Sequence, residues 1–291
     1  MIISQLINGL TLGLTYSLIA VGYSLVFGIL RLVNFSYGSV YAFGANIIVF
    51  FVSLNFGIIP AIILSMLVTG VLNILIDRIA LKPLRNQNAP GISSLITTIG
   101  ISNIITNLMI AILGSHKQPF PTIFPFGSIT IGTVTLTYNQ IGMLFVSLII
   151  LSILIYVVYN TKVGLAMRAT EQNSKAALLM GVNVNFVVAI TFFVAGVSAS
   201  IAGGLVGSYY NMAYPNMGAV AGLKAFAAAV LGGIGSLPGS IIGGLVVGVS
   251  EVGAATFIGS EYRDSVAFII LIIVLLIRPQ GLFGKKGIDK V

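Results

Sequence analysis

The chain has 291 residues, of which 57% are hydrophobic and 7% charged, and its mean hydropathy is +1.10. Fourteen basic and six acidic side chains could not cover the surface of a soluble protein of this length, which ordinarily carries about 25% charged residues. The absence of cysteine excludes disulfides, zinc–thiolate sites and cysteine nucleophiles. The net charge of +8 is therefore better explained by membrane orientation than by nucleic-acid binding.

Apolar runs of about 20 residues, long enough to cross a bilayer as helices, recur along the whole sequence. They predict an all-α, polytopic integral membrane protein with about eight to ten transmembrane helices, organised as one domain over 1–291. The N-terminus has no basic region or cleavage site and starts the first span. The expected spans are 4–28, 37–56, 58–80, 91–113, 138–159, 186–208, a short or broken helix at 219–233, 238–258 and 264–278.

Basic residues gather in four of the segments between these spans. The opposite loops keep only Lys117 and Arg263, and Lys224 falls inside a span. The positive-inside rule then predicts an outside N-terminus and a cytoplasmic C-terminus, with nine crossings if neither 219–233 nor the region around Arg31–Tyr37 is re-entrant. The clustered residues are Arg31; Arg78, Lys82 and Arg85; Lys162, Arg168 and Lys175; and Arg278, Lys285, Lys286 and Lys290.

Two loops are long. The outer loop at 114–137 contains three prolines and is expected to be an irregular cap, with His116 as a surface residue because no other metal ligand stands near it. The inner loop at about 160–185 is the most polar stretch of the chain and predicts a short amphipathic surface helix, capped by Thr170 and closed by Gly181. Polar residues at spacings of three and four share one face of it, and apolar ones the other: Arg168, Glu171, Gln172 and Lys175 against Leu178 and Leu179.

Two charges fall within predicted spans, Lys224 and Glu251, where each costs about 2.5–3.5 kcal/mol on insertion scales. Lys224 either lines a pathway or forms an internal ion pair or reaches an interface. Glu251 either contacts a substrate or makes a structural hydrogen bond. Hydrogen-bonding groups in or beside the first span, Asn8, Thr15 and Asn34, are further pathway candidates.

A glycine cluster interrupts the apolar C-terminal third. Gly232, Gly233 and Gly235, followed by Pro238, predict a break between two helices. Such backbone is tolerated at membrane depth only where protein or a water-filled cavity satisfies it, so the break marks either a transport pathway or close helix packing.

The sequence contains no zinc-protease, nucleotide-binding or serine-hydrolase motif and no paired acids within one span. We therefore expect a transport subunit rather than an enzyme, with no cofactor or metal. Energy for active transport would have to come from a partner protein or from an ion gradient.

Several long stretches resemble the permeases of branched-chain amino acid ATP-binding-cassette (ABC) importers. They are "NGLTLGLTYSLIAVGYSLVFGILRLVNFSYGSVY" at the front, "RATEQNSKAALLMGVNV" in the inner loop, "GLKAFAAAVLGGIGSLPGSIIGGLVVGVSE" and the terminal "RPQGLFG". Within the inner loop, Ala176 and Ala177 followed by Gly181 match the core of the importers' coupling motif, with Lys175 where an acid often stands.

The resemblance implies half of a translocation pore in a prokaryotic cell membrane. Its implied partners are a second related permease, two cytoplasmic ATPases docked on 164–181 and an extracytoplasmic amino-acid-binding protein. It leaves open a permease for another amino acid, urea or short amides. The residues alone also leave open an ion-coupled secondary transporter, for which only Glu251 is available as an intramembrane acid, and a channel or structural subunit.

Overall fold

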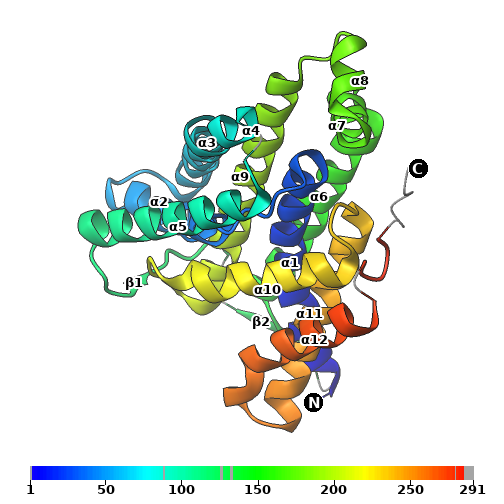
Figure 1. Cartoon of the computed structure of the whole chain (residues 1–291). Helices are drawn as coiled ribbons and strands as arrows, with labels where there is room; N and C mark the ends of the chain where they lie inside the picture. The colour runs from blue at the N-terminus through cyan, green and yellow to red at the C-terminus, as the bar shows by residue number, and fades with distance from the viewer. Residues whose placement is uncertain (1, 88, 125–126, 132–133, 279, 285–291) are drawn as a thin grey trace.

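Helices form most of the structure, a computed structural model that describes residues 2–87, 89–124, 127–131, 134–278 and 280–284 (Figure 1). Three C-terminal lysines used for the topology prediction lie outside these ranges. The α-helices are α1 (Ile2–Leu30), α2 (Tyr37–Ser53), α3 (Ile58–Ile76), α4 (Lys82–Asn86), α5 (Gly91–Leu113), α6 (Tyr138–Asn160), α7 (Lys162–Gln172), α8 (Ser174–Leu179), α9 (Val184–Tyr210), α10 (Met217–Gly232), α11 (Leu237–Phe257) and α12 (Arg263–Ile277). A π-helical turn (Asp77–Leu81) joins α3 to α4, and a 3-10 turn (Ser260–Tyr262) precedes α12.

The helices confirm the polytopic all-α fold. In the described part of the chain, six helical segments are long and apolar enough to cross a membrane: Ile3–Leu30, Ile58–Asn86, Gly91–Leu113, Tyr138–Asn160, Val184–Tyr210 and Leu237–Phe257. Helices α2 and α10 are apolar but shorter, with 17 and 16 residues, and α12 has 15. The predicted short helix at 219–233 is therefore present as α10.

Helix α1 is the centre of the fold, and 83% of its apolar window is buried, against 17% for α5 at the periphery. Its closest neighbour is α11, and small residues permit their approach. A methyl group added at Gly248 would lie 2.3 Å from the Cα of Gly13, and one added at Gly244 would lie 2.3 Å from the Ser17 hydroxyl. Ser17 also donates to the carbonyl of Ile241 at 2.8 Å. Small residues thus allow the backbones of α1 and α11 to come into direct contact, as is typical of membrane helices.

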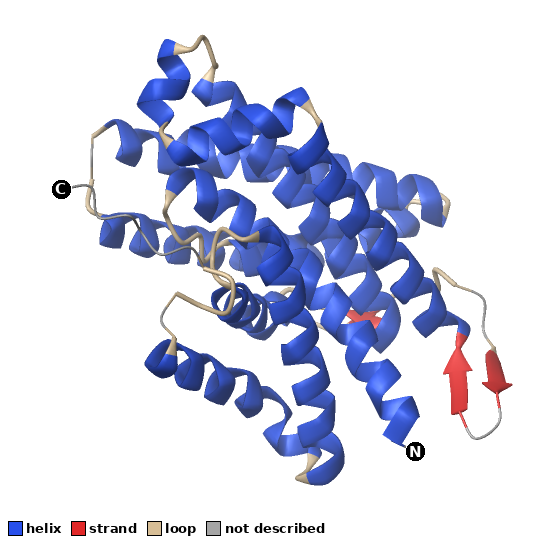
Figure 2. Cartoon of the chain, turned by 90° about the vertical axis from the view of Figure 1, so that its right-hand side faces the viewer, coloured by secondary structure: helices blue, strands red, loops and turns tan. Residues whose placement is uncertain are grey.

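The loop between α5 and α6 is more regular than predicted. Strands β2 (Ser128–Ile131) and β3 (Val134–Thr137) form an antiparallel hairpin that projects from the helical body near the N-terminus (Figure 2). Strand β1 (Gln118–Pro119) pairs with β4 (Met212–Ala213). Apolar and polar residues alternate along the hairpin, which is typical of a strand. The prolines earlier in the loop led instead to the prediction of an irregular cap. His116 is exposed, as expected.

Two non-helical segments interrupt the helices at one end of the fold. Between α1 and α2 the chain turns at Arg31, whose φ is 52°, and runs extended before α2 begins. Between α10 and α11, Gly233 and Gly235 have φ values of 98° and 92°, which L side chains rarely adopt. The predicted helix break is therefore real. The segment 281–284 packs on it, because Phe283 N donates to Gly232 O at 3.0 Å.

Candidate functional site

The predicted amphipathic helix of the inner loop is in fact two helices. Helix α7 ends at Gln172, and Asn173 starts α8 with its side chain accepting hydrogen bonds from two amides of the first turn, both at 3.1 Å. Thr170 is not a cap, contrary to the prediction. It is buried within α7 and donates to the carbonyl of Ala166 at 2.8 Å, while Thr161 caps α7. Arg168 and Lys175 therefore do not share one continuous helical face.

Helix α7 is attached to the body, whereas α8 stands at the far end of the molecule (Figure 1). Arg168 donates to the carbonyl of Tyr159 at 3.2 Å, and its guanidinium carbon lies 5.5 Å from the centre of the Tyr159 ring. Glu171 lies against Gly28 of α1, where an added methyl group would be 3.4 Å from its carboxyl carbon, and is close to Gly235. Through Glu171, α7 therefore contacts the end of α1 and lies close to the helix break.

Helix α8 presents an exposed apolar tip. Leu178, Leu179 and Met180 are 62%, 88% and 84% exposed, while Ala177 is buried and Lys175 and Ala176 are exposed. Gly181 closes the helix with φ 84°, as predicted, and its amide donates to the Leu178 carbonyl at 3.0 Å. The sequence analysis did not single out Met180, although three consecutive apolar residues in a polar loop indicate an exposed apolar cluster.

A groove of about 970 Å³ lies beside α7 at this end of the molecule. One wall is α7 with Arg168 and Glu171, and the opposite wall is the helix break with Gly235 and the segment around Phe283. Two of the coupling candidates, Arg168 and Glu171, thus line the same groove as Gly235 of the break, which lies 64 or more residues further along the chain.

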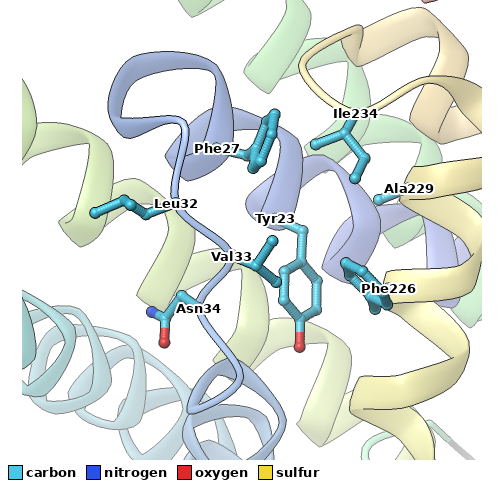
Figure 3. A pocket seen from close by; sticks show the side chains of 8 residues that line it. All are labelled: Tyr23, Phe27, Leu32, Val33, Asn34, Phe226, Ala229 and Ile234. Atoms are coloured by element: carbon cyan, nitrogen blue, oxygen red, sulfur yellow. The ribbon is translucent and has the colours of Figure 1, made fainter. Parts of the chain in front are cut away.

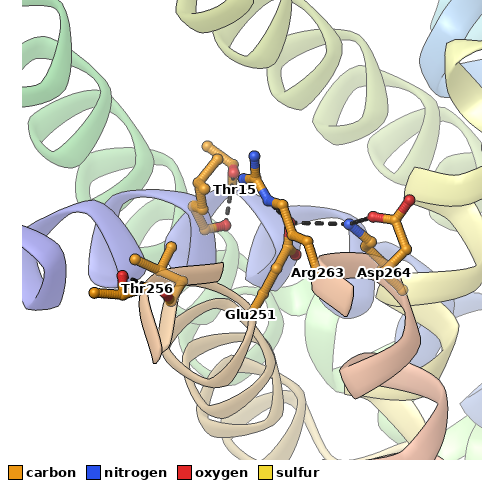
Figure 4. A network of polar contacts seen from close by, with 8 residues as sticks. Thr15, Glu251, Thr256, Arg263 and Asp264 are labelled. Atoms are coloured by element: carbon orange, nitrogen blue, oxygen red, sulfur yellow. Dashed lines mark hydrogen bonds and ion pairs between the residues drawn. The ribbon is translucent and has the colours of Figure 1, made fainter. Parts of the chain in front are cut away.

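The two intramembrane charges belong to one network (Figure 4). Lys224 Nζ lies 2.9 Å from Glu251 Oε1 and 2.6 Å from Asp264 Oδ1. Arg263 Nε donates to the same Glu251 oxygen at 2.5 Å. The side chains of Lys224 and Glu251 are 5% and 1% exposed, so the two charges form a buried ion pair within a network that ties α10, α11 and α12 together. Arg263 was placed in a loop from sequence and begins α12 instead.

The other pathway candidates are scattered. Asn8 accepts a hydrogen bond from Gln140 of α6, and Thr15 donates to the carbonyl of Leu12 in its own helix at 2.7 Å. Asn34 is buried in the extended segment, with its oxygen accepting from the amide and the hydroxyl of Ser36 at 3.0 and 2.6 Å. Within the described ranges, no group of three or more His, Cys, Asp and Glu could hold a metal ion.

Comparison with known proteins identifies the family. The model of the family described as "Branched-chain amino acid transport system / permease component" matches residues 5–275. The chain is 38% identical to the high-affinity branched-chain amino acid transport system permease protein BraD of Pseudomonas aeruginosa, over 99% of this chain and 98% of that one. It is 36% identical to the corresponding protein LivH of Escherichia coli K12, over 99% and 97% of the two chains.

Among solved structures, PsaBC from Streptococcus pneumoniae in complex with Fab contains a chain with the same fold. The TM-score is 0.52 at 14% identity, covering 95% of this chain and 92% of that one. The family model thus covers residues 5–275, and the similarity to the two transport permeases extends over 99% of the chain. The chain belongs to the family of branched-chain amino acid transport permease components.

Proposed function

We propose that this chain is the permease subunit of an ABC importer and forms half of the translocation pathway for leucine, isoleucine and valine. The observation that carries the proposal is similarity over 99% of the chain to permeases named for branched-chain amino acid transport. The absence of a nucleotide-binding motif in the sequence supports a division of labour in which partner subunits supply the energy.

The exposed tip of α8, Leu178, Leu179 and Met180, is the proposed docking point for a cytoplasmic ATPase. An apolar cluster at the end of a protruding helix is costly in water and is typical of a protein–protein contact. Two such ATPases would serve this chain and a second, related permease. The tip would thus be buried in the assembled transporter.

Movement of the ATPases would reach the pathway through α7. Glu171 touches the end of α1 at Gly28 and approaches Gly235 in the helix break. A shift of α7 would therefore press on both discontinuities at once. We assign coupling to Arg168, Glu171, Lys175, Ala176, Ala177 and Gly181, and the pathway or its hinge to Asn8, Thr15, Asn34, Lys224, Gly232, Gly233, Gly235 and Glu251.

The distribution of basic residues supports a cytoplasmic α7–α8 end and an outside N-terminus, in the cell membrane of a prokaryote. The β2–β3 hairpin then faces the extracytoplasmic side, where a binding protein would deliver the amino acid. Labelling of His116→Cys and Lys175→Cys in intact cells with a membrane-impermeant thiol reagent tests this orientation: only His116→Cys is expected to react.

The direct test is reconstitution of the chain with its proposed partners, a second permease, two ATPases and an amino-acid-binding protein. ATP hydrolysis that rises several-fold with leucine-loaded binding protein, together with leucine uptake, is the expected result. ATP hydrolysis stimulated by urea or short amides, and not by leucine, would show that the substrate is not a branched-chain amino acid. Leucine uptake driven by an ion gradient without ATP would replace the ABC assignment.

A further inference from the structure

Helix α5 has the smallest buried share of the six helical segments that could cross a membrane. Only 17% of its apolar window is buried, and α2 is the helix that it packs against most extensively (Figure 1). Its buried side consists of Ser94, Thr98, Ile105 and Met109. The opposite side faces away from this chain along the whole helix, so lipid, water or another protein must cover it.

Two asparagines occupy the middle of that exposed side. Asn103 lies at the centre of the 23-residue helix, and Asn107 lies one turn further on. Among the described residues, the side chain of Asn103 has no hydrogen-bond partner. Asn107 Nδ2 donates to the backbone carbonyl of Asn103 at 2.8 Å, which leaves its own amide oxygen without a described partner. Lipid tails offer no hydrogen bonds, so lipid is an unfavourable neighbour for this side of α5.

Helix α3 has the opposite arrangement of polar and apolar residues. Its polar residues Ser65, Thr69 and Asn73 are all fully buried in the protein. Its exposed side is aliphatic, as suits contact with lipid: Ile59, Ile63, Leu67, Val71 and Leu75. The outward asparagines of α5 are therefore a feature of that helix and not of every peripheral span in the chain.

The exposed side of α5 also has the spacing of a helix–helix contact. Residues recur there every seven positions, in two series: Ser93, Gly100 and Asn107, and Ile96, Asn103 and Ile110. Such a heptad pattern is typical of two helices that pack side by side at a shallow angle. A methyl group added at Gly100 would meet nothing within 4 Å among the described residues, so a partner backbone has room to approach.

We propose that these six residues, termed the α5 seam, pack against a membrane helix of the second permease subunit. The proposal rests on the transport function proposed above, which supplies that partner. Depth selects the occupant, because the ATPases and the binding protein lie outside the bilayer and cannot reach the centre of a spanning helix. The amides of Asn103 and Asn107 exchange hydrogen bonds with polar groups of the partner helix, as asparagines do between membrane helices.

The buried side of α5 connects the seam to the interrupted part of the fold. Thr98 Oγ1 accepts a hydrogen bond from the amide of Phe35 at 3.2 Å, which attaches α5 to the extended segment between α1 and α2. That segment meets α10 and the helix break around a pocket of about 10 Å³, whose lining includes Asn34, Phe226 and Ile234 (Figure 3). One helix thus lies between the proposed partner and the non-helical segments.

Photo-cross-linking in the membrane tests the contact. p-Benzoylphenylalanine replaces Asn103 in one variant and Leu67 in the control, which lies at the middle of α3 and is 50% exposed. A third variant carries the photoreactive residue in place of Ile96, a seam position that is 67% exposed, so that both asparagines are kept. Each variant is co-expressed with the second permease, the ATPases and the binding protein, and the cross-linked products are identified by mass spectrometry.

The yield of cross-links to the second permease is expected to be at least fivefold higher from Asn103 and Ile96 than from Leu67. In a complex that still imports leucine, yields no higher than the control would overturn the α5 seam and leave the transport function standing. Cross-links to a second copy of this chain would overturn the proposed partner. Failure of the chain to assemble with any permease would refute the proposed function itself.

A second readout uses substitutions that leave the contacts within this chain intact. Asn103→Leu removes the amide and Gly100→Leu fills the open space, so each should fold in normal yield but retain at least threefold less co-purified second permease. Asn103→Gln, which keeps an amide, should retain more of the partner than Asn103→Leu. Ser152→Leu, at an exposed position of α6, controls for added bulk and should change nothing. Undiminished co-purification in both seam variants with leucine would contradict the contact.

Discussion

Removing the charge of Glu251 alone is expected to destabilise the protein more than removing the charge of Lys224 alone. Glu251→Gln leaves Lys224 buried with only Asp264, whose side chain is 57% exposed, and Arg263 loses its carboxylate partner. Lys224→Met leaves Glu251 paired with Arg263. The two substitutions therefore differ in how much uncompensated charge they leave inside the fold.

The magnitudes follow from the burial. Breaking a buried ion pair by removing one partner costs about 3–5 kcal/mol, and the remaining contact to Asp264 places Glu251→Gln near the lower limit, about 3 kcal/mol. The retained Arg263 contact reduces the expected cost of Lys224→Met to about 2 kcal/mol. Each single change removes the same Lys224–Glu251 contact. The double variant should therefore lose about 3 kcal/mol of unfolding free energy rather than the sum of the two single losses, which corresponds to a coupling energy of about 2 kcal/mol.

Equilibrium unfolding by sodium dodecyl sulfate in mixed micelles measures the free energy of unfolding of the four proteins in this cycle. The chain has no tryptophan, so a site-specific label or circular dichroism has to report unfolding. Additive single effects, or a Lys224→Met cost larger than that of Glu251→Gln, would show that the network does not hold α10, α11 and α12 together as described.

Three other perturbations have defined outcomes. On α11, Gly248→Ala should impair folding because the new methyl group would meet the Gly13 backbone, whereas Gly253→Ala, with nothing within 4 Å, should be tolerated; equal yields of folded protein would contradict the packing of α1 on α11. Leu179→Asp should leave membrane insertion intact and weaken co-purification of the ATPases at least tenfold, and undiminished co-purification would move the docking surface elsewhere. Gly235→Ala forces an L side chain into a left-handed conformation at the break and should slow transport more than Gly253→Ala; matching uptake rates would leave the break without a hinge role.

Much of the transmembrane body could be predicted from the sequence, because long apolar runs bounded by glycine, proline or polar residues leave few alternatives. The span at 91–113 coincides with α5, and the glycine break at 232–235 lies where it was expected. The positive φ of Gly181, Gly233 and Gly235 follows from the same residue-level argument.

The errors have both local and tertiary origins. Asn173 divides the inner helix because its side chain caps α8, a local competition that helical spacing alone does not reveal. Arg263 joins the charge network because the turn after α11 folds it back on Glu251. The pocket around Asn34 depends on segments separated by about two hundred residues, and no period in the sequence relates them.

The account's central claim is ATP-driven import of branched-chain amino acids, and uptake of radiolabelled leucine at sub-micromolar concentration tests it most directly. Cells with and without this gene are compared, with ATP depletion and an ionophore as separate arms. We expect deletion of the gene to abolish high-affinity leucine uptake. In wild-type cells, we expect leucine uptake to fall on ATP depletion but not on collapse of the ion gradients. Uptake that survives deletion in a strain without a second leucine system, or that collapses with the gradient alone, would contradict the claim.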